Sequence, residues 1–176
     1  MSSGAPFSDC GRYRYLLWRE WAPDRGRLLW IMLNPSTADA SRDDPTITRC
    51  KERAYRLGYG GIEVVNLFAL RATNPKALKA VAYPTGIEND RHIAAATGGK
   101  RQIIAAWGSH GAYRNRGVAV RRVLEECGVL HRVLVLGLTK GGEPKHPLYV
   151  GYDVRPKTWL PLAAPRAALA PEGEGE

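Results

Sequence analysis

The stretch WIMLNPSTAD, residues 30–39, decides how this chain folds. An unbroken apolar run ends at Asn34 and Pro35 and gives way to small and polar residues. Apolar runs of this length are typical of buried strands, and an Asn-Pro pair is a turn signal. In open α/β sheets, ligands bind in the loops that leave the carboxyl ends of strands. The pattern therefore predicts that Asn34 lies at the floor of an active site.

Strand and helix patterns alternate along the rest of the chain. Residues 12–21 are rich in β-formers, and the turn at residues 23–26 joins them to the apolar run, which predicts a β-hairpin. Asp44 and Pro45 predict a helix start, because Asp caps a helix and Pro loses no hydrogen bond in its first turn. Gly58 is expected to end that helix. Further strands are expected over residues 62–68, 102–107 and 132–136, and further helices over residues 74–81, 87–97 and 114–127.

This order of elements predicts the fold class. Strand–helix–strand units favour parallel, right-handed crossovers. The expected fold is α/β: a three-layer α/β/α sandwich with a central, mainly parallel sheet of about four strands plus an N-terminal hairpin strand. Residues 1–160 are expected to form a single domain, and the Ala/Pro/Gly/Glu composition predicts a disordered tail over residues 161–176. The inward face of helix 114–127 is expected to carry Val118, Val120, Val123, Leu124 and Cys127.

The composition is that of an ordinary globular protein with a strong basic excess. The 176 residues carry a net charge of +9, which favours a polyanionic partner, and nucleic acid is the commonest one. No apolar run approaches the roughly 20 residues that cross a bilayer, and no secretory signal begins the sequence, so no membrane association and a cytoplasmic location are expected. No obligate protein partner is inferred.

Cofactor and metal signals are missing from the sequence. The three cysteines, Cys10, Cys50 and Cys127, are odd in number and far apart, and no Cys/His pair has zinc spacing. Cys50 and Cys127 fall on helical apolar faces, which predicts that both lie in the core. The Gly-rich residues 137–142 lack the spacing of a phosphate loop, and no dinucleotide-binding fingerprint follows the first strand. We therefore expect neither a metal nor a cofactor.

Four chemically interesting residues follow predicted strands or loops on one edge of the sheet. Asn34, Asn66, Trp107 and His146 all fall at such positions. Two amides, an imidazole and an aromatic ring make a pocket for a planar heterocycle, because a carboxamide pairs with a base edge at two places. Taken singly, Asn34 is an ordinary turn residue, Trp107 and Phe68 are ordinary core residues, and Asn66 needs a partner if buried.

The landmarks MLNPSTAD, DDPT, VVNLFALRAT, AWG and KHPLY, spread over residues 32–149, identify a family resemblance. The chain resembles a bacterial and phage domain family of unknown function that lies within or near the uracil-DNA glycosylase superfamily. This resemblance implies cleavage of the N-glycosidic bond of a flipped, possibly modified, base in DNA. Asn34 would then position the attacking water, Asn66 would read the base, and His146 would stabilise the departing base.

The same resemblance assigns secondary roles to neighbouring residues. Leu148 matches the place of a wedge that enters the duplex, and the base slot would include Pro35, Ser36, Phe68, Trp107 and Pro147. Phosphate contacts are expected from Arg42, Lys51, Arg71, Lys140 and Lys145. The chain departs from the pattern at Ser36, where the mismatch-specific branch has Gly. It also lacks an Asp directly beside the first strand, and whether Asp39 or Asp43 assists Asn34 stays open.

Three other functions remain open from the sequence. One is a relative that binds nucleic acid or a nucleotide without hydrolysing it, or that acts on it by a different reaction. Another is an enzyme that processes a free nucleoside or nucleotide. The third is an enzyme acting on an unrelated small molecule, with the basic charge incidental. A steep loss of binding with added salt would favour DNA over a small ligand.

Overall fold

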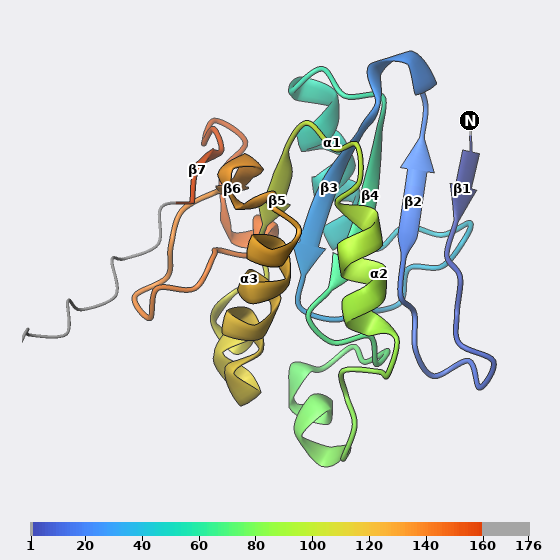
Figure 1. Cartoon of the computed structure of the whole chain (residues 1–176). Helices are drawn as coiled ribbons and strands as arrows, with labels where there is room; N and C mark the ends of the chain where they lie inside the picture. Colours follow the sequence, from blue (N-terminus) through green and yellow to red (C-terminus); the bar gives the residue numbers. More distant parts are fainter. Residues whose placement is uncertain (1, 160–176) are drawn as a thin grey trace, which may run out of the picture.

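A computed structural model describes residues 2–159, and the tail expected from residue 161 onward lies outside them. Three α-helices and seven strands alternate along the described chain (Figure 1). In chain order they are β1 (Ser2–Gly4), β2 (Leu17–Glu20), β3 (Arg27–Met32), α1 (Pro45–Arg56), β4 (Gly61–Asn66), α2 (Asn89–Ala96), β5 (Ile103–Ala105), α3 (Arg116–Glu126), β6 (Val133–Val135) and β7 (Lys157–Thr158). Short 3₁₀ helices lie at Pro23–Arg25, Pro75–Ala80, Ser109–Asn115, Leu130–Arg132 and Pro147–Tyr149.

The described strands form one mixed sheet in the order β1-β2-β4-β3-β5-β6-β7. Strands β4, β3, β5 and β6 are parallel to their neighbours within this group, whereas β1, β2 and β7 pair antiparallel at the two sides. The α/β class and the mostly parallel sheet are as predicted from the sequence. The sheet has seven strands rather than about four and a hairpin strand.

The predicted β-hairpin is wrong. Strand β2 precedes β3 in the chain, but β4 lies between them and pairs with both. Its fully buried sequence, GIEVVN, explains this place, because a central strand must offer apolar side chains to both faces of a sheet. The turn at residues 23–26 is present, but it separates β2 and β3 by the width of one strand.

The order of the parallel strands creates a crevice. From β3 the chain passes through α1 to β4 on one side, and later elements continue through β5 and β6 on the other side. The direction of winding therefore reverses between β3 and β5. In open α/β sheets the loops at such a switch point diverge at the carboxyl ends of the strands and leave room for a ligand.

Two hydrophobic clusters cover opposite faces of the sheet. In β3, Leu28 and Trp30 pack in the cluster that contains the apolar side of α1, whereas Leu29 and Ile31 pack in the cluster that contains α2 and α3. Successive side chains of a strand point to opposite faces, so β3 supplies both clusters. Figure 1 shows α2 and α3 in front of the sheet and α1 behind it.

Local signals fix the ends of α1 as predicted. The Asp44 carboxylate accepts a hydrogen bond from the Ile47 N–H at 2.9 Å, and Pro45 occupies the first turn. At the other end, Gly58 has φ 84°, a left-handed value that glycine adopts at little cost, and the helix stops there. The Asp44 cap also sets the end of the loop, residues 33–44, that carries the Asn-Pro motif.

Helix α3 differs from the expected inward face at two positions. Val118 is 54% exposed, and the Cys127 thiol is exposed. Val120 and Leu124 are fully buried, so the buried stripe is narrower than predicted. The helix lies against α2 and the sheet along that one line, and Val118 projects away from it. Cys50, the other cysteine expected in the core, is buried, and burial raises its pKa.

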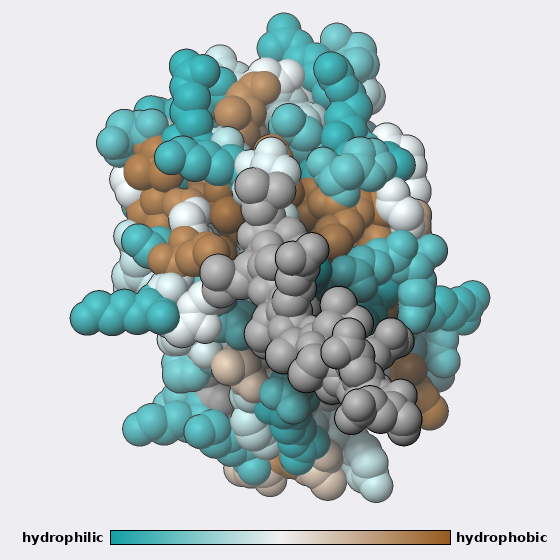
Figure 2. Space-filling model, turned by 60° about the vertical axis from the view of Figure 1, so that its left-hand side comes forward, coloured by the Kyte–Doolittle hydropathy of each residue, from teal (hydrophilic) through white to brown (hydrophobic). Residues whose placement is uncertain are grey.

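The surface is largely hydrophilic on the side that Figure 2 presents, with brown hydrophobic residues interrupted by teal hydrophilic ones. Within residues 2–159 no helix combines the length and the apolarity that crossing a membrane requires.

Candidate active site

A cavity of about 900 Å³ lies at the carboxyl edge of the parallel strands. Its walls come from the loops after β3, β4 and β5, from the first turn of α1, and from residues 139–149. The cavity is therefore at the switch point between β3 and β5, where this topology opens a crevice. Seven of the residues predicted from the sequence line it: Asn34, Ser36, Asn66, Trp107, Lys145, His146 and Leu148.

The side chain of Asn34 is held in one orientation. Its amide nitrogen donates to the carbonyl oxygens of Pro35, at 3.0 Å, and Ala72, at 2.7 Å. Because both acceptors are carbonyls, the NH₂ group must face them, and the Oδ1 atom lies on the other side. Within residues 2–159 no donor reaches that Oδ1. Asn34 thus offers the cavity a fixed hydrogen-bond acceptor, suited to a water molecule or to an N–H of a ligand.

Asn66 presents an unpartnered donor. The residue is 2% exposed at the end of β4, and its Nδ2 is buried without a hydrogen-bond partner among the described residues. Its main-chain oxygen accepts a 2.8 Å hydrogen bond from the fully buried Asn89, which fixes the end of the strand. A buried amide N–H without a partner costs about 1–3 kcal/mol. A ligand in the cavity that accepts from Asn66 would recover that cost.

His146 is neutral and has a defined tautomer. Burial lowers the pKa of its imidazole to about 4, and the charge of Asp44 opposes this effect only in part. The Nδ1 atom accepts from the Leu148 N–H at 3.3 Å, so the single proton of the neutral ring is on Nε2. His146 therefore supplies a neutral N–H donor at the cavity wall. It begins the 3₁₀ helix Pro147–Tyr149, which sets the direction of its side chain.

Trp107 forms an apolar wall of the cavity, and its indole N–H already has a hydrogen-bond partner. The ring is 1% exposed, packs edge-on against Trp159 at 5.4 Å between centroids, and donates its Nε1–H to Glu143. The backbone packs closely here, since a Cβ at Gly111 would lie 2.0 Å from the Trp107 ring. The ring is thus fixed and gives the cavity a rigid apolar wall.

The other predicted site residues lie outside the cavity walls. Phe68 is fully buried and packs against Tyr113 on the α3 side of the sheet, so the structure removes it from the base slot. Pro35 and Pro147 are buried, and their carbonyl oxygens accept hydrogen bonds from the side chains of Asn34 and Arg49, respectively. The remaining predicted contacts are surface cations: Arg42 and Lys140 are exposed, Lys51 pairs with Asp43 at 2.7 Å, and Arg71 is stacked on Phe7.

The structure adds wall residues that sequence reasoning missed. Arg14 and Asp44 are both buried and both line the cavity, and Tyr149 lines it while 85% exposed. Within the described residues, Asp44 is the carboxylate that lines this cavity. Asp39 is tied to the backbone N–H groups of Ser41 and Arg42 instead. The cap signal at Asp44 was visible in the sequence, but its second contact, with the cavity, depends on where α1 begins in space.

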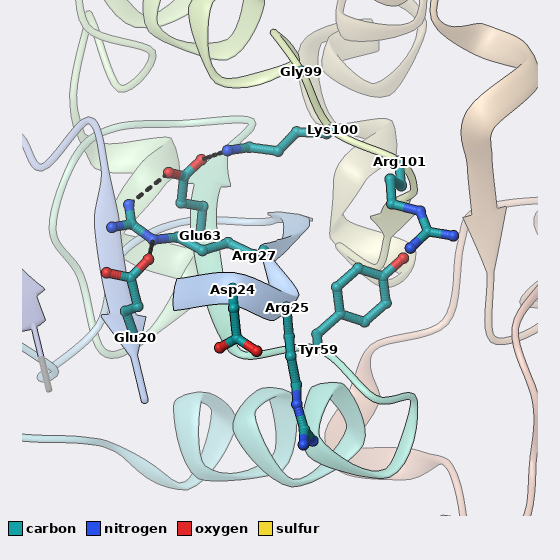
Figure 3. A pocket seen from close by; sticks show the side chains of 10 residues that line it. Glu20, Asp24, Arg25, Arg27, Tyr59, Glu63, Gly99, Lys100 and Arg101 are labelled. Carbon is teal, nitrogen blue, oxygen red and sulfur yellow. Dashed lines mark hydrogen bonds and ion pairs between the residues drawn. The ribbon is translucent and has the colours of Figure 1, made fainter. Parts of the chain in front are cut away.

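A second, smaller cavity of about 400 Å³ lies at the amino ends of β3 and β4. Of its charged side chains, Asp24, Arg25 and Arg101 are exposed to solvent. Figure 3 shows the other four bonded to one another: Glu63 bonds both Arg27, at 2.9 Å, and Lys100, at 2.7 Å, and Arg27 also bonds Glu20. These charges satisfy each other, whereas the larger cavity holds polar groups without partners. In addition, no group of three or more metal-ligating side chains occurs within residues 2–159. The larger cavity is therefore the candidate active site.

Fold and cavity define an α/β protein with a ligand-sized cleft at the carboxyl edge of its sheet. The chain belongs to the family described as "Protein of unknown function (DUF1643)", whose model matches residues 14–148. The matched segment contains every predicted site residue and extends from Arg14 to Leu148, so it includes most of the cavity wall. Searches of curated proteins and of solved structures gave no match to this chain.

Proposed function

We propose that this protein hydrolyses the N-glycosidic bond of a base held in the large cavity, as a relative of the uracil-DNA glycosylase superfamily with its three-layer α/β/α architecture. The observation that carries the proposal is the convergence of Asn34, Asn66 and His146, three residues far apart in sequence, on one cavity. Two of them expose the atom that such a reaction needs, the Asn34 Oδ1 and the His146 Nε2–H.

In the proposed reaction the bond between the sugar C1′ and the base nitrogen breaks, and the base leaves with the electron pair. His146 donates its Nε2–H to the base oxygen, where negative charge develops, and a preorganised donor is worth most at such a position. Because the imidazole is neutral, it donates a hydrogen bond without first losing or gaining a proton. Asn66 donates to the same base through its unpartnered Nδ2 and so selects an edge that carries an acceptor.

Water completes the reaction at the sugar. Asn34 holds a water molecule through its Oδ1, the water oxygen bonds to C1′, and its proton passes to the Asp44 carboxylate. Asp44 is suited to this, because its Oδ1 is occupied by the helix cap while no described residue donates to its Oδ2. Its negative charge also favours the cationic sugar in the transition state. Asp44 then releases this proton to solvent and the base anion takes up a proton, so the products are the free base and an abasic sugar.

The test uses oligonucleotides that carry uracil, mismatched thymine, hypoxanthine or hypermodified pyrimidines, in single strands and duplexes. Alkaline cleavage reports abasic sites. We expect cleavage of at least one base, a fall of about 10²–10³-fold in Asn34→Ala and His146→Ala, and an unchanged rate in His131→Ala, which removes an exposed histidine from another surface. Asp44→Asn should lose activity while keeping the helix cap, since Asn caps as well as Asp. Hydrolysis that survives both Asn34→Ala and His146→Ala would refute the site.

Binding without hydrolysis is the second candidate function. The net charge of +9 and the exposed cations Arg42, Lys140 and Lys145 favour nucleic acid whether or not a bond is cleaved. The same oligonucleotides distinguish the two functions. Tight, salt-sensitive binding with no abasic site from any base would support a binding protein and overturn the proposed hydrolysis.

A further inference from the structure

Four arginines are buried in the described chain, and Arg14 differs from the other three in its hydrogen bonding. Arg19, Arg53 and Arg116 each make at least three hydrogen bonds, to carboxylates, to backbone carbonyls or to both. Arg14 makes one, from Nη1 to the Ala38 oxygen. A guanidinium carries five N–H donors, so most of those of Arg14 remain for another partner.

The charge of Arg14 is also unpaired. The side chain is 2% exposed, its Nε is buried without a partner, and no described carboxylate lies within 4.0 Å of it. Burial lowers the pKa of Arg14 to about 10, which leaves the group protonated at neutral pH. The charge of Asp44 supports the protonated form from a distance, whereas Arg71 and Arg19 oppose it. A buried, uncompensated cation is costly, so the site is built for an anion that the protein itself does not supply.

Arg14 lines the same cavity as Asn66, whose buried Nδ2 also lacks a partner. Two buried donors without acceptors therefore share one cavity, and the hydroxyls of Ser36, Thr37 and Thr73 line it as well. Arginine forks and hydroxyls are typical partners of phosphate oxygens. The cavity, at about 900 Å³, is the size of a site for a nucleotide-sized ligand rather than for a bare phosphate ion.

We propose that Arg14 forms an anion subsite that receives the terminal phosphate monoester of a nucleotide. A phosphodiester inside a strand carries a sugar on both sides and stays at the protein surface, so it cannot reach a guanidinium buried to this extent. A terminal phosphate can, whether it belongs to a free nucleotide or to the end of a strand. The inference rests on the cavity of the proposed function and names its substrate class, but it does not require the hydrolytic step.

The test is calorimetric titration of the full chain, without hydrolysis as a readout. The probes are deoxynucleoside 5′- and 3′-monophosphates, each compared with its own nucleoside, together with inorganic phosphate alone. We expect at least one monophosphate to bind about tenfold or more tightly than its nucleoside, as a charge-assisted hydrogen bond implies. A 5′-phosphorylated oligonucleotide compared with its 5′-hydroxyl form shows whether strand ends are also received.

Arg14→Met is expected to reduce that preference to within about twofold, because the forked donor and its charge are gone. Arg12→Met is the matched control: it removes the same charge from an exposed residue that does not line the cavity, and the preference should persist. If Arg14→Met does not fold, Arg14→Lys replaces it, and we expect it to keep only part of the preference.

Two results would overturn the inference. In one, the unaltered protein binds every monophosphate no better than its nucleoside, and binds both forms of the oligonucleotide equally. In the other, the preference for a monophosphate survives Arg14→Met. These outcomes are separable from the proposed function. Preferential binding of monophosphates with no bond cleavage would support the subsite and refute the hydrolysis. Base release from DNA without any preference for a terminal phosphate would support the hydrolysis and refute the subsite.

Discussion

Acidification should weaken this protein through His146. Burial lowers the pKa of the folded-state imidazole to about 4 from the ordinary 6.5, so the folded chain keeps the ring neutral where the unfolded chain protonates it. Between these two values the unfolded state binds more protons, and stability falls as the pH falls. Lowering the pH from 7 to 5 should therefore remove about 2 kcal/mol of unfolding free energy through this one group.

The assay compares urea unfolding of the unaltered protein and His146→Gln at pH 7 and pH 5. The variant lacks the titrating ring, so its loss of stability over this range should be smaller by about that 2 kcal/mol. His131→Gln, in which an exposed histidine is removed, is the control and should follow the unaltered protein. Two parallel pH dependences for the unaltered protein and His146→Gln would refute the argument. So would an NMR titration in which the folded-state pKa of His146 lies near 6.5.

Three further substitutions test local features of the fold by urea unfolding. Asp44→Ala should cost about 1 kcal/mol through loss of the α1 cap while Asp44→Asn stays within about 0.5 kcal/mol, and equal losses would exclude a capping role. Cys50→Ser should cost about 1–3 kcal/mol, because it buries a hydroxyl in an apolar cluster, whereas Cys127→Ser at the surface should stay within about 0.5 kcal/mol; similar values would contradict the assigned burial. Gly60→Ala should cost about 3 kcal/mol, since its Cβ would lie 1.6 Å from the Ala22 oxygen, and a stable Gly60→Ala would mean that this close approach is absent.

The proposed phosphate subsite and the proposed hydrolysis place different demands on one cavity. A base that leaves as an anion is stabilised by a hydrogen-bond donor, which neutral His146 supplies, whereas a phosphate with its permanent charge favours the cation of Arg14. Both groups line the cavity, which gives a nucleotide two recognisable ends within one site. The exposed cations at its margin, Lys145 above all, would add attraction for a polyanion without selecting a base.

Sequence by itself determined the features that depend on neighbours in the chain. The Asp44 cap and the stop at Gly58 fixed α1 because both act within one turn of the helix. The apolar runs at β3 and β4 marked buried strands, and each ended at an asparagine that the structure places at the cavity. These asparagines were predictable because parallel strands bring their carboxyl ends to a common edge whatever their order.

Only the tertiary structure decided what depends on distant partners. The hairpin prediction failed because two short strands joined by a turn carry no local mark of a third strand between them, and β4, which comes later in the chain, pairs with both. Phe68 was a predicted member of the base slot, but it packs against Tyr113 of the 3₁₀ helix Ser109–Asn115, a partner that is distant in the sequence. The sequence did not mark Arg14 as a site residue. Whether a buried arginine has a carboxylate partner depends on which segments of the whole fold surround it, and no local pattern records this.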